Sequence, residues 1–319
     1  MLMDVKRKLI AFLCVLLAIP AFAAYPEQPI KLIVPYPAGG NGDIIARVFA
    51  KALSDNVQRP VVVENKPGAS GVIGATEVAR AKPDGYTLLF TVTTQLSNQS
   101  FNVKPSYDAT RDFEPIIGVT KAPLVLAVSK ESHINDIKEL GTTTKREPFS
   151  YGSYGAGTST HVLPYLLSRQ LGIEMIHVPY RGENPLITDL MGGRINMGLL
   201  SLNRGIELAR SGKVILLGVV GNQRSVYLPD VPTLTEQGYR NMDWSYGTAV
   251  YASAGVPKEI RQVLHEKSKE AMQDPALVTA LDQQRNELWK NSTPQQLKTR
   301  LVEDTKNWKK VLGQLGNIE

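Results

Sequence analysis

Short apolar strands alternate with helical segments along most of the chain, and this alternation limits the folds that it can adopt. The first strands are expected at 31–35, 61–65 and 86–92, separated by helices that begin near Asp43 and after Gly71. This βαβαβ order predicts a parallel sheet with helices on both faces. Ligands of such folds bind beyond the carboxyl ends of the strands. The loops that follow the strands are therefore the candidate site.

A second set of α/β units is expected from Leu124 onward. The expected strands are 124–128, 149–152, 174–178, 195–200, 214–220 and 244–252, and the expected helices are 158–171, 184–192, 257–272 and 294–312. The apolar face of the last helix, expected to pack on a lobe, consists of Leu297, Leu301, Trp308, Val311 and Leu312. About 300 mature residues exceed what one core usually serves. We expect an α/β fold with two lobes: lobe 1 from 24–124 and 246–319, and lobe 2 from 125–245.

Residues 1–23 have the layout of a secretory signal peptide. Three basic residues at 6–8 precede an apolar run at 9–19, and Ala21-Phe22-Ala23 forms a small-x-small cleavage site. The run is too short to span a bilayer comfortably, so we expect export and cleavage after Ala23, with an uncleaved anchor as the alternative. Cys14 lies inside this run. The mature chain then has no cysteine, which excludes disulfides and thiolate chemistry.

The charge of the mature chain favours a small anionic ligand. Residues 1–23 hold three Lys or Arg and one Asp, so their removal lowers the formal net charge from +6 to +4. The basic residues are scattered among acidic ones, whereas a nucleic-acid-binding protein would carry a basic stripe. We therefore expect no nucleic acid as a partner.

The first candidate ligand loop is the turn Pro37-Ala38-Gly39-Gly40-Asn41-Gly42, which joins a strand to a helix. Glycine allows the backbone to turn its N–H groups toward a ligand, and a helix start leaves up to four such donors unpaired. We interpret this loop as half of a carboxylate clamp, with a flexible connection that binds nothing as the alternative. Asp43 is expected to be a first-turn or N-cap acid, so a ligand carboxylate should meet the amides instead. Neither a dinucleotide fingerprint nor a Walker loop fits these residues.

Two further loops have the same strand–turn–helix pattern. In 151–161, Ser153, Thr158 and the free amides can point at one anionic oxygen, and Thr158 is a competent N-cap. In 178–185, Arg181 can hold a carboxylate with two hydrogen bonds, or it can be a solvated surface residue. Tyr36 and Tyr180, each just before a turn, can close over a ligand or pack on their own lobes.

Enzyme chemistry is the competing interpretation, as a secreted hydrolase that uses Ser153 and His161. A nucleophile elbow would need glycine at Tyr151, and His161 is placed for packing or capping rather than for a triad. The four histidines lack zinc-site spacing. We expect no catalysis, no metal and no cofactor.

Several short motifs occur in order along the chain: Val34-Pro35-Tyr36-Pro37-Ala38-Gly39-Gly40 with Asp43 and Ala46-Arg47, Val63-Glu64-Asn65-Lys66-Pro67-Gly68-Ala69, Lys82-Pro83-Asp84-Gly85-Tyr86-Thr87-Leu88, Tyr151-Gly152-Ser153-Tyr154-Gly155, Val178-Pro179-Tyr180-Arg181-Gly182, Thr188-Asp189-Leu190-Met191-Gly192-Gly193 and Ala254-Gly255-Val256-Pro257. Together they resemble the extracytoplasmic solute receptors of tripartite tricarboxylate transporters, the Bug family, over essentially the whole mature chain.

The resemblance implies a two-lobed, type II-like periplasmic binding protein whose lobes are mixed, mostly parallel sheets flanked by helices, with a hinge of two crossing strands. Such a protein closes on a carboxylate and delivers it to a membrane permease, and we expect a monomer in the periplasm. The family's ligand loops map onto 36–43 and 180–184. The chain departs from the family pattern at 41–42, 183–185 and 200–203, where we expect the distal end of the ligand to be recognised.

The expected ligand-binding residues come from these loops and from the end of two further strands. They are Tyr36, Ala38, Gly39, Gly40, Asn41, Asp43, Thr93, Ser153, Thr158, His161, Tyr180, Arg181, Gly182 and Ser201. The ligand is left open among dicarboxylates, tricarboxylates, aromatic acids and amino acids.

Overall fold

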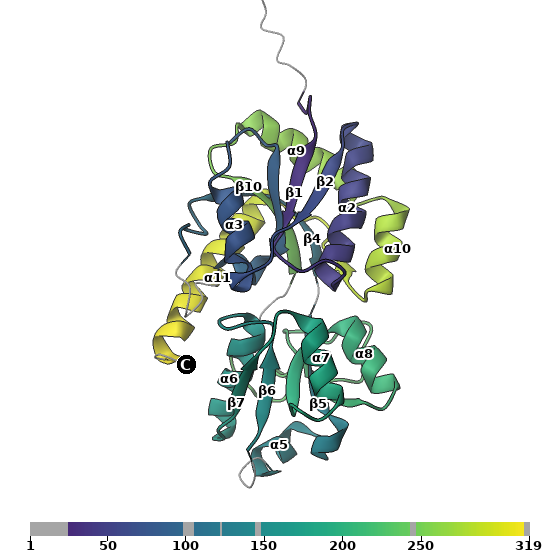
Figure 1. The fold of residues 1–319 in the computed structure, drawn as a ribbon, viewed down its shortest axis with the longest axis vertical. Coiled ribbons are helices and arrows are strands. Elements are labelled where there is room, and N and C mark those ends of the chain that lie inside the picture. The colour runs from purple at the N-terminus through teal and green to yellow at the C-terminus, as the bar shows by residue number, and fades with distance from the viewer. Residues whose placement is uncertain (1–24, 98–104, 122, 144–147, 243–246, 316–319) are drawn as a thin grey trace, which may run out of the picture.

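The computed structural model describes residues 25–97, 105–121, 123–143, 148–242 and 247–315. Two sheets form two lobes, one above the other in Figure 1, which confirms the predicted two-lobed α/β fold. The signal peptide, residue 122 and residues 243–246 lie outside the described residues, and the hinge of two crossing strands stays a prediction. The exact limits of the lobes stay a prediction.

The upper lobe is built on a six-stranded sheet in the order β11-β4-β10-β3-β1-β2. The first three strands are parallel, as predicted, whereas β10 runs antiparallel to both β3 and β4 and makes the sheet mixed. Strand β4 was not expected from the sequence. The strands are β1 (Ile30–Val34), β2 (Val61–Asn65), β3 (Thr87–Val92), β4 (Phe113–Lys121), β10 (Gly247–Ser253) and β11 (Glu287–Leu288).

Helices cover both faces of this sheet because its strands are apolar on both sides. Leu32 of β1 packs in the core beneath α2, α9 and α10, while its neighbour Ile33 packs in the core beneath α3 and α11. The helical segments of this lobe are α2 (Asn41–Val57), η1 (Ala69–Gly71), α3 (Val72–Ala79), α4 (Thr93–Ser97), α9 (Lys258–Ala271), α10 (Pro275–Gln283) and α11 (Pro294–Leu315).

The lower lobe has a five-stranded sheet in the order β7-β6-β8-β5-β9. Strand β6 is parallel to β7 and β8, and β5 is antiparallel to β8 and β9. Helices α5 and α6 pack on one face, and α7 and α8 pack on the other. The elements are β5 (Leu124–Ser129), η2 (Lys130–Ser132), α5 (Ile137–Thr143), β6 (Ser150–Ser153), α6 (Ser159–Leu171), β7 (Ile176–Pro179), α7 (Glu183–Met191), β8 (Met197–Ser201), α8 (Leu202–Arg210) and β9 (Val214–Val219).

Helix α8 was not predicted, although it lies at the boundary between the lobes. Leu202, Ile206 and Leu208 are buried against the sheet. Gly205 faces β5 so closely that a Cβ atom at this position would overlap Val125. A glycine, which disfavours a helix in isolation, is required here because the helix must approach the strand.

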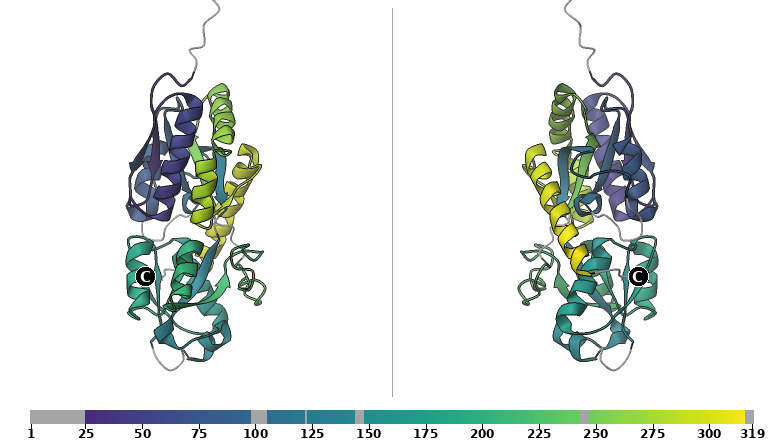
Figure 2. Two further views of the ribbon diagram at one scale, coloured as in Figure 1. Left: turned by 90° about the vertical axis from the view of Figure 1, so that its right-hand side faces the viewer. Right: turned by 90° about the vertical axis from the view of Figure 1, so that its left-hand side faces the viewer.

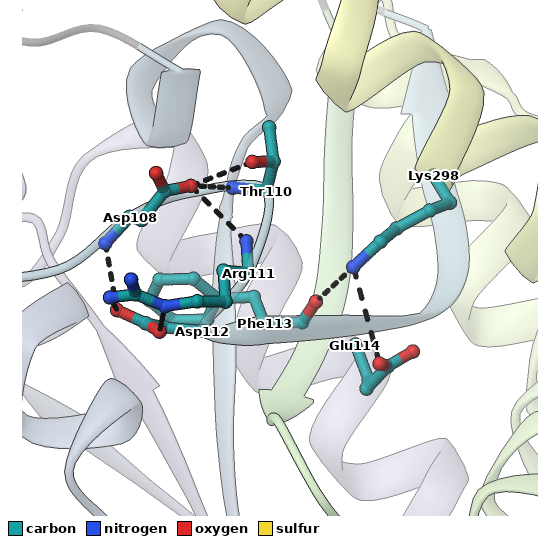
Figure 3. A network of polar contacts seen from close by, with 7 residues as sticks. All are labelled: Asp108, Thr110, Arg111, Asp112, Phe113, Glu114 and Lys298. Atoms are coloured by element: carbon teal, nitrogen blue, oxygen red, sulfur yellow. Dashed lines mark hydrogen bonds and ion pairs between the residues drawn. The ribbon is translucent and has the colours of Figure 1, made fainter.

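The C-terminal helix α11 crosses the upper sheet and reaches the level of the lower lobe (Figures 1 and 2). Leu297, Leu301 and Trp308 are buried, which confirms that the predicted apolar face packs on a lobe; the side chains of Val311 and Leu312 lie outside the described set. Figure 3 shows how Lys298 fastens this helix to β4: its Nζ donates to the Phe113 carbonyl at 2.9 Å.

Candidate functional site

A cavity of about 740 Å³ lies between the two lobes. The upper lobe contributes the start of α2, with Gly39, Gly40 and Asn41, and the end of α10. The lower lobe contributes the start of α7 and much of α8. Figure 1 shows α2 and α10 of the upper lobe above α7 and α8 of the lower one. The three predicted residues of the first loop therefore line an inter-lobe cleft, and Ala38, also in this loop, is exposed.

Asp43 holds the first loop in shape. Its carboxylate accepts hydrogen bonds from the Gly39 amide at 2.8 Å, from Arg47 Nε at 3.0 Å and from Asn65 Nδ2 at 2.8 Å, although the residue is only 3 % exposed. Burial opposes ionisation, but the hydrogen bonds from Arg47, Gly39 and Asn65 outweigh it and lower the pKa of Asp43. Asp43 is thus a first-turn acid, as predicted, whose carboxylate is committed to its own loop.

The start of α2 presents main-chain donors to the cleft. The helix begins at Asn41, so the amides of its first turn have no partners within the helix. The Gly39 amide is used by Asp43. Gly40 is the N-cap and provides no capping side chain, and the nearest atom that a Cβ atom there would meet is 3.8 Å away. This combination leaves space and N–H groups where an anion can approach.

Two predicted residues of the upper lobe face inward. The hydroxyl of Tyr36 accepts a hydrogen bond from the Val92 amide at 2.7 Å and lies 3.1 Å from Thr91 Oγ1. Tyr36 therefore packs on its own lobe. Thr93, at the start of α4, is 2 % exposed.

The second loop, between β6 and α6, uses its donors internally. The amides of Tyr154, Gly155 and Gly157 donate to Thr160 Oγ1, Ser153 Oγ and His161 Nδ1. The prediction that the amides of this loop are free for a ligand is therefore wrong for these three. Thr158 is the N-cap of α6, as predicted, but its hydroxyl donates to the Gly155 carbonyl rather than capping the helix.

The loop rests on a pair of stacked histidines. The rings of His161 and His177 lie 3.7 Å apart and nearly parallel, and Ser153 Oγ is 2.7 Å from His177 Nε2. Burial lowers the pKa of each histidine to about 4, with the neighbouring His177 adding to the effect at His161. His161 is thus a packed, capping residue, as predicted. Ser153 is fully buried and bonded to His177, so the hypothetical Ser153–His161 pair is not formed.

In the third loop, between β7 and α7, one predicted residue packs inward and another is exposed. The Tyr180 hydroxyl donates to Asp189 Oδ2 at 2.7 Å and so packs on its own lobe, while Arg181 is exposed. Gly182 is the N-cap of α7 with a φ of 108°, a conformation that glycine adopts at least cost.

Glu183, which the sequence singled out only as a departure from the family pattern, joins three elements at the floor of the cleft. Its carboxylate accepts from the Tyr154 hydroxyl at 2.9 Å, the Ser201 amide at 2.6 Å and the Ser201 hydroxyl at 2.7 Å. The donors of Ser201, a predicted ligand residue, are thereby occupied by Glu183.

Hydrogen bonds join the lobes on both sides of the cleft. Ser70 Oγ, just before α3, donates to the Ala156 carbonyl at 3.0 Å. On the side of α8 and α10, Asn203 Nδ2 donates to Gln284 Oε1 at 2.9 Å. In Figure 1 α3 and α6 lie on the opposite side of the molecule from α8 and α10. The lobes are therefore held together around the cavity.

The described part of the chain has no helix that is both long and apolar enough to cross a bilayer. Within the same residues, no three His, Cys, Asp or Glu side chains gather in a way that could hold a metal ion.

Comparisons with known proteins place these features in a family. The model of the tripartite tricarboxylate transporter family receptor matches residues 45–317. BugT of Bordetella pertussis is 31 % identical over 319 residues, covering 97 % of this chain and 98 % of BugT. The structure of the periplasmic binding protein BugD is 31 % identical, with a TM-score of 0.82 over 91 % of this chain and 98 % of BugD.

A third similar structure contains a ligand. MatC from Rhodopseudomonas palustris, solved with bound malate, is 25 % identical, with a TM-score of 0.82 over 90 % of this chain and 99 % of MatC. The match of the family model over most of the chain, together with full-length relatives above 30 % identity, confirms the resemblance drawn from the motifs. The chain belongs to the tripartite tricarboxylate transporter receptor family, whose members are periplasmic solute-binding proteins.

Proposed function

We propose that this protein is a periplasmic receptor that captures a small carboxylate between its lobes and delivers it to a tripartite tricarboxylate-type membrane permease. It is exported with a signal peptide cleaved after Ala23, and it acts as a monomer. The observation that carries the proposal is the convergence of the starts of α2, α7 and α8 on one inter-lobe cavity. Helix starts favour anions, through their unpaired N–H groups and the helix dipole.

The charges around the cavity support an anionic ligand. Arg204, Arg210 and Arg285 line it, against two carboxylates, Glu183 and Glu207. Glu183 is already satisfied by hydrogen bonds from the lower lobe, and Glu207 is paired with Arg204 at 2.6 Å. A carboxylate entering the cavity therefore meets main-chain donors and three guanidinium groups, against one carboxylate, that of Glu207, whose side chain is 62 % exposed. The malate bound in MatC agrees with this class of ligand.

Binding without catalysis is the more consistent interpretation. A hydrolytic serine must reach its substrate, whereas Ser153 is fully buried beneath its loop. We assign contacts with one carboxylate to the amides at 40–42 and to the loop at 180–182, with Thr158 and Arg181 approaching as the lobes move. The loops that contact the ligand are supported by four side chains that pack beneath them: Tyr36, Thr93, His161 and Tyr180.

A thermal-shift screen of the mature protein with malate, citrate, benzoate and aspartate tests the proposal. A ligand at 100 times its dissociation constant stabilises the folded state by about 2.7 kcal/mol, so a true ligand raises the melting temperature measurably. Gly40→Val should weaken binding strongly while leaving the melting temperature of the unliganded protein nearly unchanged. Arg181→Ala should cost about 1.5–3 kcal/mol of binding energy if this residue holds the carboxylate. No stabilisation by any of the four acids would contradict the proposed function.

A further inference from the structure

We propose that the α8–α10 side of the cavity is a second anion subsite, centred on Arg204, and that the receptor prefers hydroxylated six-carbon diacids. This inference rests on the proposed function and adds the length and polarity of the ligand to it. The first carboxylate lies at the start of α2, and the second anionic group reaches across the cavity to the guanidinium of Arg204.

Arg204 is placed for this role and incompletely paired. It lies in the first turn of α8 and lines the cavity. One Nη donates to Glu207 at 2.6 Å, but among the residues that the structure describes the buried Nε has no hydrogen-bond partner. A guanidinium pairs best through two parallel hydrogen bonds with a carboxylate. A modest rotation of this half-buried side chain toward the cavity would allow a ligand carboxylate to accept such a pair of bonds.

Asn203, the residue before Arg204, also has a buried polar atom without a hydrogen-bond partner within the described residues. Asn203 donates through Nδ2 to Gln284 across the lobes, while its buried Oδ1 has no partner within the described residues. A ligand hydroxyl can donate to such an oxygen. An acceptor and a donor, on adjacent residues of one helix, are thus left unsatisfied on the same wall of the cavity. Buried polar groups normally find partners, so their lack of one here points to a bound molecule that carries both kinds of group.

The opposite wall adds a second cation. Arg285 follows α10 and lines the cavity, with its guanidinium held 5.3 Å from the ring centre of Tyr227 in the lower lobe. This cation–π contact bridges the lobes, and Arg285 lines the same cavity as Arg204. Two guanidinium groups on facing lobes can therefore share one anionic group.

The rest of the lining favours a polar ligand. Carboxamide side chains dominate the wall between the two ends, and Ile44 and Ile206 are its aliphatic residues. Carboxamides both donate and accept, as hydroxyl groups on a ligand require, whereas an aromatic or alkyl chain would leave them unpaired. The cavity of about 740 Å³ is in the range that accepts larger ligands than a four-carbon acid.

Titration calorimetry with three six-carbon probes tests separately whether binding requires a second carboxylate and whether it requires hydroxyl groups. Glucarate has two carboxylates and four hydroxyls, gluconate lacks one carboxylate, and adipate lacks the hydroxyls. We expect glucarate to bind at least tenfold more tightly than either of the others. Arg204→Ala should lower the affinity for glucarate at least tenfold and change the affinity for gluconate less than twofold. The affinity of Arg204→Lys for glucarate should lie between those of the wild type and Arg204→Ala. Arg169→Ala, an exposed arginine on α6, is the matched control and should change neither.

The outcomes distinguish this inference from the proposed function. Equal losses for glucarate and gluconate in Arg204→Ala, or no loss for either, would overturn the second subsite. So would a wild-type protein that prefers benzoate or malate to glucarate, although its carboxylate-receptor function would stand. A wild-type protein that binds neither the three six-carbon probes nor any of malate, citrate, benzoate and aspartate would overturn both. The melting temperature of each unliganded variant, expected within a few degrees of the wild type, checks that folding is not the cause.

Discussion

Replacing Asp43 with asparagine tests whether one buried carboxylate shapes the first ligand loop. The substitution keeps the size of the side chain and removes its charge. One oxygen remains as an acceptor, but the new NH₂ group faces groups that are themselves donors, the Gly39 amide and Arg47 Nε, or Asn65 Nδ2. At least one buried donor is therefore left without an acceptor.

The structure sets the size of the effect. Hydrogen bonds to a charged group contribute about 1.5–3 kcal/mol each, and a buried donor left unsatisfied costs about 1–3 kcal/mol. The side chain of Arg47 is 51 % exposed, so solvent screens its share, and the Gly39 and Asn65 bonds carry most of the loss. We expect Asp43→Asn to lower the free energy of unfolding by about 2–4 kcal/mol at pH 7 and to weaken ligand binding, because the Gly39–Gly40 turn loses its anchor.

Urea denaturation at pH 7, followed by circular dichroism, measures this loss. The matched control is Asp55→Asn on the same helix, since Asp55 also pairs with a cation four residues away but its side chain is 56 % exposed. The control should lose only about 0.3–0.5 kcal/mol. Because the pKa of Asp43 is lowered, its contribution is present above the ordinary aspartate pKa and is lost as the pH falls through the folded value. Equal losses in the two variants would refute the anchoring role.

Three other predictions concern the pH response, the packing of α8 and the contact between lobes. Acidification from pH 6.5 to 4 should lower the free energy of unfolding by about 3 kcal/mol through His161, whose folded pKa is about 4, and further through His177, whose folded pKa is also about 4. This stability is retained above pH 6.5, and urea midpoints that do not move over this range would contradict the prediction. Gly205→Ala should cost about 1–3 kcal/mol by overpacking, whereas Gly141→Ala, with ordinary contacts in α5, should be neutral or stabilising in thermal melts. Ser70→Ala should increase the radius of gyration of the unliganded protein in X-ray scattering, because it removes an inter-lobe hydrogen bond.

Apolar periodicity was sufficient to predict most of the fold. The strands at 61–65 and 214–220 and the helix at 158–171 emerge within two residues of their expected limits. The helix and the strand at 214–220 bury apolar residues, and in the strand at 61–65 Val61 and Val63 pack on the core while partly buried. Helix α8 was missed because Gly205 interrupts its apolar pattern, and the reason for that glycine is the closeness of β5. A packing requirement between distant segments cannot be read from either segment alone.

Some features of the site that depend on the local backbone could be predicted from the sequence. Contacts between side chains that are far apart in the sequence could not. Thr158 was predicted as the N-cap of α6 from its turn chemistry, whereas the other two helix starts were placed one to three residues too late, so that their N-caps, Gly40 and Gly182, were not predicted. The Ser153–His177 pair joins residues 24 positions apart and exists because β6 and β7 are parallel neighbours. Once that pairing is assumed, Tyr151 faces His177 in register, so the strand order was the missing signal.

The position of α10 explains why a cleft of this kind needs a chain that returns to its first lobe. Helices α2, α7 and α8 each follow the carboxyl end of a strand, so each sheet turns its helix starts toward the other lobe. Strand β10 re-enters the upper sheet between β3 and β4 and leads, through α9, to α10. The end of α10 then brings Gln283, Gln284 and Arg285 to the cavity opposite α8, so a C-terminal segment and the N-terminal loop at 39–41 line the same cavity.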